Sequence, residues 1–368
     1  GVRVVRAFAQ ESSELDKFTR RNKAYHDITL HLTTLMGAYW GLSDMIGYLQ
    51  IALSGVCGVY FAVHGGFSLG NVLLFTTYTS MLTFPMRQLG RILADLGKAD
   101  ISLSRLEDIL AVPAEAEPGK ALTPQIDGSV AFEDVCFDYG DGVPVLSHVS
   151  FTVRPGQTIG ILGSTGAGKS SLVQLLQRLY PVTAGRITLS GVDVNDIERH
   201  HLRRNVGIVL QEPFLFSKSF KDTISDGSNR HDIESVRKYA RLAVIDDTID
   251  RFAEGYDTQI GERGVTISGG QKQRVAIARM LMQNTPIKIF DDSLSAVDME
   301  TDAKIRESIN KNVRGTTILI AHRITTIMNA DQIIVMDKGR IVQRGTHETL
   351  SKEDGIYKRI YDTQRSAT

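Results

Sequence analysis

The longest apolar feature of the chain spans residues 45–86, which contain no Asp, Glu, Lys or Arg. As one helix this stretch would be on the order of 60 Å long at ~1.5 Å per residue, about twice the ~30 Å hydrocarbon core of a bilayer. The sequence His-Gly-Gly at residues 64–66 interrupts it near the middle, where a tight turn is expected. The pattern therefore predicts two membrane spans, over about residues 35–64 and 67–90.

Basic residues flank the apolar stretch on both sides. Three precede it and three follow it, namely Arg20, Arg21, Lys23, Arg87, Arg91 and Lys98. Because basic residues collect at the cytoplasmic ends of spans, the pair is expected to form a hairpin with both ends in the cytoplasm. The alternative is a buried helical pair in a soluble protein, but the run is rich in Thr and Gly rather than densely packed with Leu and Ile.

The pattern changes after the predicted hairpin. A charged helical stretch continues to about residue 110, and prolines then predict an irregular linker over residues 113–127. Beyond it short apolar strands alternate with helical stretches, which is typical of an α/β fold with a mainly parallel sheet. We therefore expect a partial, all-α membrane domain over residues 1–112 and an α/β domain over residues 128–368.

A phosphate-binding motif, G-x-x-x-x-G-K-S, lies between an apolar strand and a helix in the α/β domain. Its glycines let backbone N–H groups face an anion at a helix N-terminus, where the dipole also favours phosphate. Lys169 is expected to reach the outer phosphates of ATP or GTP, and Ser170 to bind Mg²⁺. The residues assigned to the nucleotide are Gly163, Ser164, Thr165, Gly166, Ala167, Gly168, Lys169, Ser170 and Ser171. The alternative is a chance glycine-rich turn.

Composition adds little to these motifs. Lys plus Arg and Asp plus Glu number 42 each in 368 residues, so no basic excess indicates a nucleic-acid partner. Cys57 and Cys136 lie far apart, match no metal-binding spacing and are interpreted as reduced structural thiols. The chain begins with Gly rather than Met, so we expect it to be the C-terminal portion of a longer protein.

A second glycine-rich sequence, Ser268, Gly269, Gly270 and Gln271, opens another predicted helix. Its N–H groups can form an anion site without a lysine of its own, as expected of a loop that serves the nucleotide of another chain. The sequence resembles the signature of ABC transporters, and with the phosphate loop it makes essentially the whole chain similar to ABC exporters. The resemblance implies an ATPase domain of the P-loop α/β type with a helical subdomain, coupled to transport.

The resemblance also implies roles for residues around the phosphate loop. Asp291, at the end of an apolar strand, resembles the aspartate that positions Mg²⁺, and Gln211 resembles the glutamine that senses the γ-phosphate. Ser170, Gln211 and Asp291 are thus the candidate Mg²⁺ ligands. Asp298 lies in a sequence resembling the loop that crosses the dimer interface.

Two further positions carry an alternative. His322 follows an apolar strand and matches the switch histidine, although an isolated His is more often structural. Tyr139 resembles the aromatic residue that stacks on adenine, which favours ATP, and the alternative is that it packs a β-hairpin.

The chain's beginning and a loop before the signature resemble exporter segments that join the two domains. Residues 1–9 resemble a cytoplasmic coupling helix that docks on the opposite subunit, and residues 261–264 resemble the loop that contacts such helices. If so, the predicted spans are the last two of a six-span exporter domain, and the fragment alone could not transport.

One position departs from the family pattern. Asp292 occupies the place where strongly hydrolytic members carry a glutamate as general base. Its side chain is one methylene shorter, and misplacing a base by about 1 Å can cost on the order of a hundredfold in rate. With the intact signature, this resembles the weakly hydrolytic half of a heterodimeric multidrug exporter. The alternative is that Asp292 works adequately through a water.

These observations predict an integral membrane half-transporter, in the plasma (cell inner) membrane with its ATP-binding domain in the cytoplasm. ATP binding would close two nucleotide domains and move a substrate such as a drug or lipid, with a second half-transporter, more often a different chain, as partner. The alternatives are a homodimeric exporter, a regulatory ATP-binding subunit and a soluble ABC ATPase acting on nucleic acid or translation factors. Residues 45–86 argue against the last.

Overall fold

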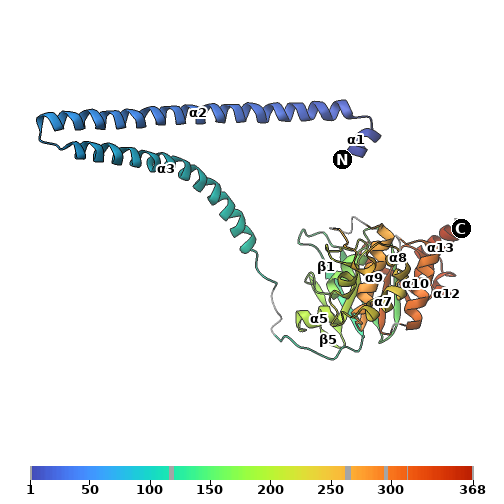
Figure 1. The fold of residues 1–368 in the computed structure, drawn as a ribbon. Helices are drawn as coiled ribbons and strands as arrows, with labels where there is room; N and C mark the ends of the chain where they lie inside the picture. Colours follow the sequence, from blue (N-terminus) through green and yellow to red (C-terminus); the bar gives the residue numbers. More distant parts are fainter. Residues whose placement is uncertain (1, 116–119, 262–266, 294–296, 313, 367–368) are drawn as a thin grey trace. The chain divides into compact units, whose positions relative to one another are not determined.

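The computed structural model of the chain describes residues 2–115, 120–261, 267–293, 297–312 and 314–366 (Figure 1). It divides into two compact units, Gly1–Ala114 and Glu115–Thr368. This division lies within the segment predicted as a linker, and each unit is described here by itself.

The first unit is entirely helical. It contains α1 (Val2–Ala7), α2 (Glu11–His64) and α3 (Leu69–Leu110). The α2 helix ends at His64, the first residue of the predicted turn, and Gly66 in that turn takes a φ of 75°. The Ser68 side chain caps α3 by accepting a hydrogen bond from the N–H of Asn71. Small residues let the two long helices approach, because Gly58 is buried against Val72.

The two long helices differ in hydropathy. Among the described residues, only α2 is long and apolar enough to cross a membrane by length and composition, with a mean hydropathy of 1.7 in its most apolar window. Residues 67–90 lie mainly in α3, which does not reach that hydropathy. On this measure the second span stays a prediction.

The second unit contains two sheets. An antiparallel sheet has the strand order β2-β1-β4-β5, and a six-stranded sheet has the order β10-β9-β3-β8-β7-β6. Neighbours in the larger sheet are parallel except for the β9-β10 pair. The strands are β1 (Val130–Phe137), β2 (Leu146–Val153), β3 (Thr158–Gly163), β4 (Ala184–Leu189), β5 (Val192–Asp193), β6 (Val206–Val209), β7 (Ile287–Asp291), β8 (Thr316–Ile320), β9 (Gln332–Asp337) and β10 (Arg340–Gly345).

Helices accompany these sheets, and some of the helices form a subdomain of their own. They are α4 (Lys169–Leu176), α5 (Arg199–Asn205), α6 (Phe220–Ser225), α7 (Ile233–Leu242), α8 (Asp246–Ile249), α9 (Gly269–Met282), α10 (Met299–Asn312), α11 (Ile324–Ile327), α12 (His347–Leu350) and α13 (Ile356–Ser366), with a 3₁₀ turn at Gly255–Asp257.

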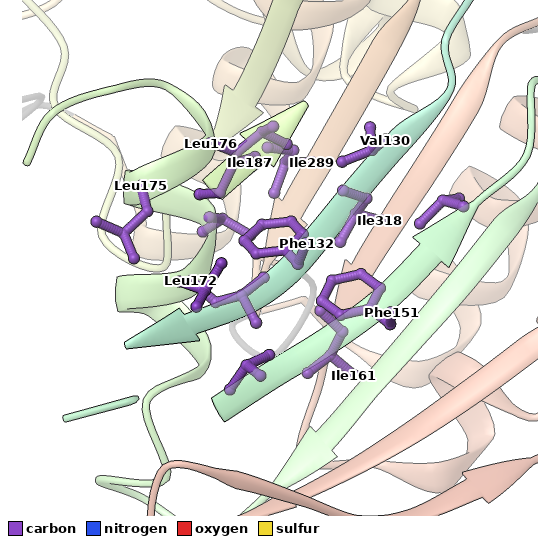
Figure 2. Packing of buried hydrophobic residues seen from close by; sticks show 14 of the residues in the cluster. Val130, Phe132, Phe151, Ile161, Leu172, Leu175, Leu176, Ile187, Ile289 and Ile318 are labelled. Carbon is purple, nitrogen blue, oxygen red and sulfur yellow. The ribbon is translucent and has the colours of Figure 1, made fainter. Parts of the chain in front are cut away.

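The hydrophobic core explains how these elements hold together. Figure 2 shows side chains of both sheets and of α4 pointing toward one another, including Leu172 and the stacked rings of Phe132 and Phe151, whose centroids are 4.6 Å apart. A second buried cluster joins α6, α7, α8 and α9, with Phe220 and Ile277 among its members. The prediction of an α/β fold with a helical subdomain, preceded by a helical segment, is confirmed.

Candidate nucleotide-binding site

The phosphate loop connects β3 to α4, as its sequence predicts. Gly166 and Gly168 take φ values of 81° and 91°, in the left-handed region that favours glycine. A Cβ atom at Gly168 would also lie 2.6 Å from Cδ2 of Leu146 and 2.9 Å from the carbonyl oxygen of Val145. The backbone can therefore curl tightly into the start of α4 only with glycine at this position.

Lys169 points back into the loop. Its Nζ donates hydrogen bonds to the carbonyl oxygens of Gly163, at 2.9 Å, and Ser164, at 2.8 Å. Burial lowers the pKa of Lys169, while Asp291 and Asp292 raise it in part. The ammonium is thus preorganised inside the loop at the place where phosphate oxygens would meet it.

Ser170 and Asp291 meet at the edge of the sheet. The Ser170 hydroxyl donates to Oδ1 of Asp291 at 3.1 Å, and Asp291 is only 5% exposed at the end of β7. Burial raises the pKa of Asp291, and the neighbouring Asp292 raises it further. A hydroxyl and a carboxylate in contact form a donor set that suits Mg²⁺, which typically takes one or two protein oxygens and completes its shell with water and phosphate.

Asp292 and His322 reach the same edge from neighbouring strands. The N–H of Asp292 donates to the carbonyl oxygen of Ile320 at 2.9 Å, and Asp292 takes a φ of 45°. His322 follows the end of β8 by two residues and lines a cavity of about 450 Å³ together with Gly163 and Ser164. The structure thus brings His322 beside the phosphate loop.

Tyr139 lies beside the helix that follows the phosphate loop. Its hydroxyl is 2.9 Å from Oγ of Ser171, and its ring packs edge-on against Phe137 and Tyr180 at centroid distances of 4.8 and 5.1 Å. The side chain remains 51% exposed. Both adenine stacking and local packing stay compatible with this arrangement.

Gln211 follows β6, the strand that pairs with β7, so it lies at the same end of the sheet as Asp291. It is exposed, and no hydrogen bond among the described residues joins it to Ser170 or Asp291. The predicted Mg²⁺ contact of Gln211 therefore stays a prediction.

Sequence reasoning missed Gln273 on α9, which is buried and donates to the carbonyl oxygen of Leu210 at 3.1 Å. Gln273 thereby ties α9 to the segment that carries Gln211.

The signature sequence forms the start of α9. Ser268 and Gln271 make a reciprocal capping box, in which each side chain accepts a hydrogen bond from the other's backbone N–H. Among the residues that the structure describes, nothing lies within 4 Å of a Cβ atom placed on Gly269, so this face of the loop is open to them. Gly270 is the second residue of α9. The signature loop lies in the helical subdomain, far from Lys169 in the sequence and outside the buried cluster that borders Lys169.

Asp298 takes a helix-capping position. Its Oδ1 accepts from the N–H of Thr301 at 2.9 Å, and this hydrogen bond lowers the pKa of Asp298. Its side chain is exposed, which leaves it accessible to a partner. Residues 262–264 of the predicted exporter loop, and residues 295 and 296 before Asp298, lie outside the described residues.

Comparisons with known proteins match both units. The ABC transporter transmembrane region model matches residues 1–86, and the ABC transporter model matches residues 146–295. The first unit thus belongs to a membrane domain, and the second binds ATP. A chain with this arrangement is an integral membrane protein with its ATP-binding domain in the cytoplasm.

Three relatives indicate the range of the similarity. The Bacillus subtilis ATP-binding/permease protein YgaD, to which multidrug export is ascribed, is 36% identical over 99% of this chain and 63% of its own length. The ATP-dependent lipid A-core flippase of Syntrophus aciditrophicus is 35% identical over 99% and 61%. The alpha-hemolysin translocation ATP-binding protein HlyB of Escherichia coli is 39% identical over 83% and 44%.

A solved structure agrees with these relatives. A bacterial Atm1-family ABC exporter with ATP bound is 33% identical, with a TM-score of 0.85 over 99% of this chain and 65% of that one. The chain therefore spans less than two thirds of the length of these proteins. It belongs to the ABC transporters of the exporter type, in which a transmembrane region and an ATP-binding domain share one chain.

Proposed function

We propose that the chain is the C-terminal part of an ATP-driven export half-transporter that pairs with a second half-transporter in the plasma (cell inner) membrane. The observation that carries this proposal is the separation of two anion sites within one ATP-binding domain. The Lys169 loop packs on the sheets, whereas the Ser268 loop opens a helix of the helical subdomain. Two such chains facing each other would complete two nucleotide sites.

In this proposal the residues of the sheet edge act together on ATP. Lys169 and the loop N–H groups bind the phosphates, while Ser170 and Asp291 hold Mg²⁺, which neutralises charge on the transferred phosphoryl group. Gln211 and His322 respond to the γ-phosphate, and Tyr139 supports adenine. The signature loop would contact the ATP of the partner chain through Ser268, Gly269, Gly270 and Gln271. Asp298 would lie at the interface between the two half-transporters.

We further propose that the site containing Lys169 hydrolyses ATP slowly. The backbone N–H of Asp292 is fixed to Ile320, so the short aspartate cannot be advanced by a simple shift of its backbone. This supports a heterodimer whose partner carries the stronger base. The homodimeric exporter and the regulatory ATP-binding subunit remain the alternative proposals, and the named relatives suggest drugs, lipids or toxins as substrates.

The experiment that tests ATP binding uses the full-length transporter. Lys169→Ala should strongly reduce photo-labelling of this chain by 8-azido-ATP, because a charge on the outer phosphates is lost from a preorganised loop. Lys288→Ala, which removes another buried lysine of the same domain, is the control for loss of folding. Labelling of the Lys169→Ala chain at unchanged strength would contradict the assignment.

A further inference from the structure

The C-terminal helix α13 holds the segment that contains His322. The Nε2 of Gln364 donates to the carbonyl oxygen of His322 at 2.8 Å, and Oε1 of Gln364 accepts from the N–H of Ile324 at 2.8 Å. One side-chain amide thus bonds the backbone on both sides of Arg323. These two bonds fix the direction in which the chain passes through His322.

The contact replaces a helix cap that the local sequence lacks. Ile324 begins α11, and Arg323 at the N-cap position makes no side-chain hydrogen bond to the helix. The first N–H groups of a helix have no partner within it, and a buried helix end needs one from elsewhere. Ile324 is 2% exposed, and Gln364, distant in the sequence, supplies that partner.

The helix that presents Gln364 is itself firmly anchored. Tyr357 of α13 is fully buried, its hydroxyl is 2.8 Å from Nδ1 of His347, and its N–H donates to Oε1 of Gln343. Tyr357 shares a buried apolar cluster with Ile324 and Ile327 of α11. The position of Gln364 therefore follows from the packing of the domain core.

The same helix borders the nucleotide site. Ile356, Arg359 and Ile360 of α13 line the cavity that is also lined by Ser164 of the phosphate loop and by His322. A change in the docking of α13 would thus be felt at His322 and beside the phosphate loop.

We propose that Gln364 is a positioning residue for His322, through which the C-terminal helix sets the response of this site to the γ-phosphate. This inference rests on the proposed role of His322. Gln364 does not touch the nucleotide in this scheme and acts only through the backbone of residues 322–324.

The test compares binding of ATP and ADP to this chain in the full-length, assembled transporter, by photo-labelling with 8-azido-ATP and 8-azido-ADP. Because only ATP carries the γ-phosphate, the ratio of the two affinities reports all contacts to that phosphate, and its change in His322→Ala reports the contribution of His322, whichever of the two sites hydrolyses. Gln364→Ala should reduce the preference for ATP about fivefold, the factor that one intramolecular hydrogen bond contributes. Gln364→Glu, which keeps the acceptor for Ile324 but loses the donor to His322, should also reduce it.

A double-mutant cycle separates positioning from general destabilisation. In a His322→Ala background, Gln364→Ala should cause no further loss of ATP preference. The matched control Tyr357→Phe removes the hydroxyl contact with His347, while its ring keeps α13 docked in the buried cluster. It removes no bond to residues 322–324, so it should leave the ratio unchanged.

Three other outcomes of these measurements would overturn different parts of the proposal. If His322→Ala leaves the ratio unchanged, the role of His322 is wrong and Gln364 has nothing to position. If His322→Ala lowers the ratio but Gln364→Ala does not, the positioning role alone is overturned. Equal losses from Gln364→Ala with and without His322 would also overturn it, because they would show a structural effect only.

Discussion

Replacing Asp292 tests why the Lys169 site should be slow. Asp292→Glu adds one methylene and moves the carboxylate toward an attacking water, while the bond between the residue's N–H and Ile320 keeps the backbone in place. If reach is the only defect, turnover at this site should rise by up to about 10²-fold, the cost of misplacing a catalytic group by ~1 Å. The φ of 45° sets the structural cost. Because aspartate tolerates this left-handed backbone region better than longer side chains do, we expect Asp292→Glu to lower the unfolding free energy by about 1 kcal/mol.

The assay is ATPase turnover of the purified full-length complex, with Asp292→Asn as the matched control of equal size. In a heterodimer that hydrolyses at the partner's site, Asp292→Asn should leave most turnover intact. If Asp292 is the working base, the same change should cost about 10²- to 10⁴-fold. Abolished turnover in Asp292→Asn would refute a slow site and favour the homodimer.

Two further predictions concern the ATP-binding domain. Gly168→Ala should lower the Tm and weaken ATP binding, because the new methyl group meets Leu146 and the carbonyl of Val145, whereas Gly140→Ala at a similar φ of 92° has open space and should cost less in both measurements. Burial lowers the pKa of Lys288 to about 8 from 10.5. The unfolded chain then binds more protons than the folded chain between these pH values. The unfolding free energy of the parent domain should therefore rise with pH from about 8 to 10.5, by at most ~1.4 kcal/mol per unit, relative to Lys288→Met. A parallel pH dependence of the two proteins in denaturant titrations would contradict this.

The local motifs could be predicted from the sequence because each is contiguous. The phosphate loop carries its strand, glycines and helix within a few residues, and Asp291 is recognised by the apolar strand that it ends. In both cases the residues that fix the geometry are neighbours along the chain. The alternation of apolar strands and helical stretches predicts an α/β fold with a mainly parallel sheet, and the helical subdomain is expected from the family resemblance alone. The separate antiparallel sheet was not predicted, because it pairs β1 with the distant β4.

Contacts between distant residues could not be predicted in this way. The bonds from Gln364 to His322 and Ile324 depend on how α13 docks, and a single glutamine in an amphipathic helix gives no pattern that indicates a distant cap. The same holds for the segment predicted as a linker. Glu115 pairs with Arg203, and Leu122 bridges to Ile197, so these two residues of that segment are docked on the second unit. Proline content indicates irregular backbone but not whether that backbone is docked.

In the proposed transporter, the signature loop of this chain serves the nucleotide of its partner. The most direct measurement is photo-labelling of both chains by 8-azido-ATP, together with ATPase turnover, in the full-length complex carrying Gly269→Asp. The new side chain meets none of the described residues around Gly269 and leaves α9 undisturbed, while its charge repels phosphate. We predict that labelling of this chain at the Lys169 loop stays unchanged while turnover at the partner's site is lost. Loss of labelling at the Lys169 loop with turnover at the partner's site intact would show that the signature loop serves its own chain, and would contradict the account.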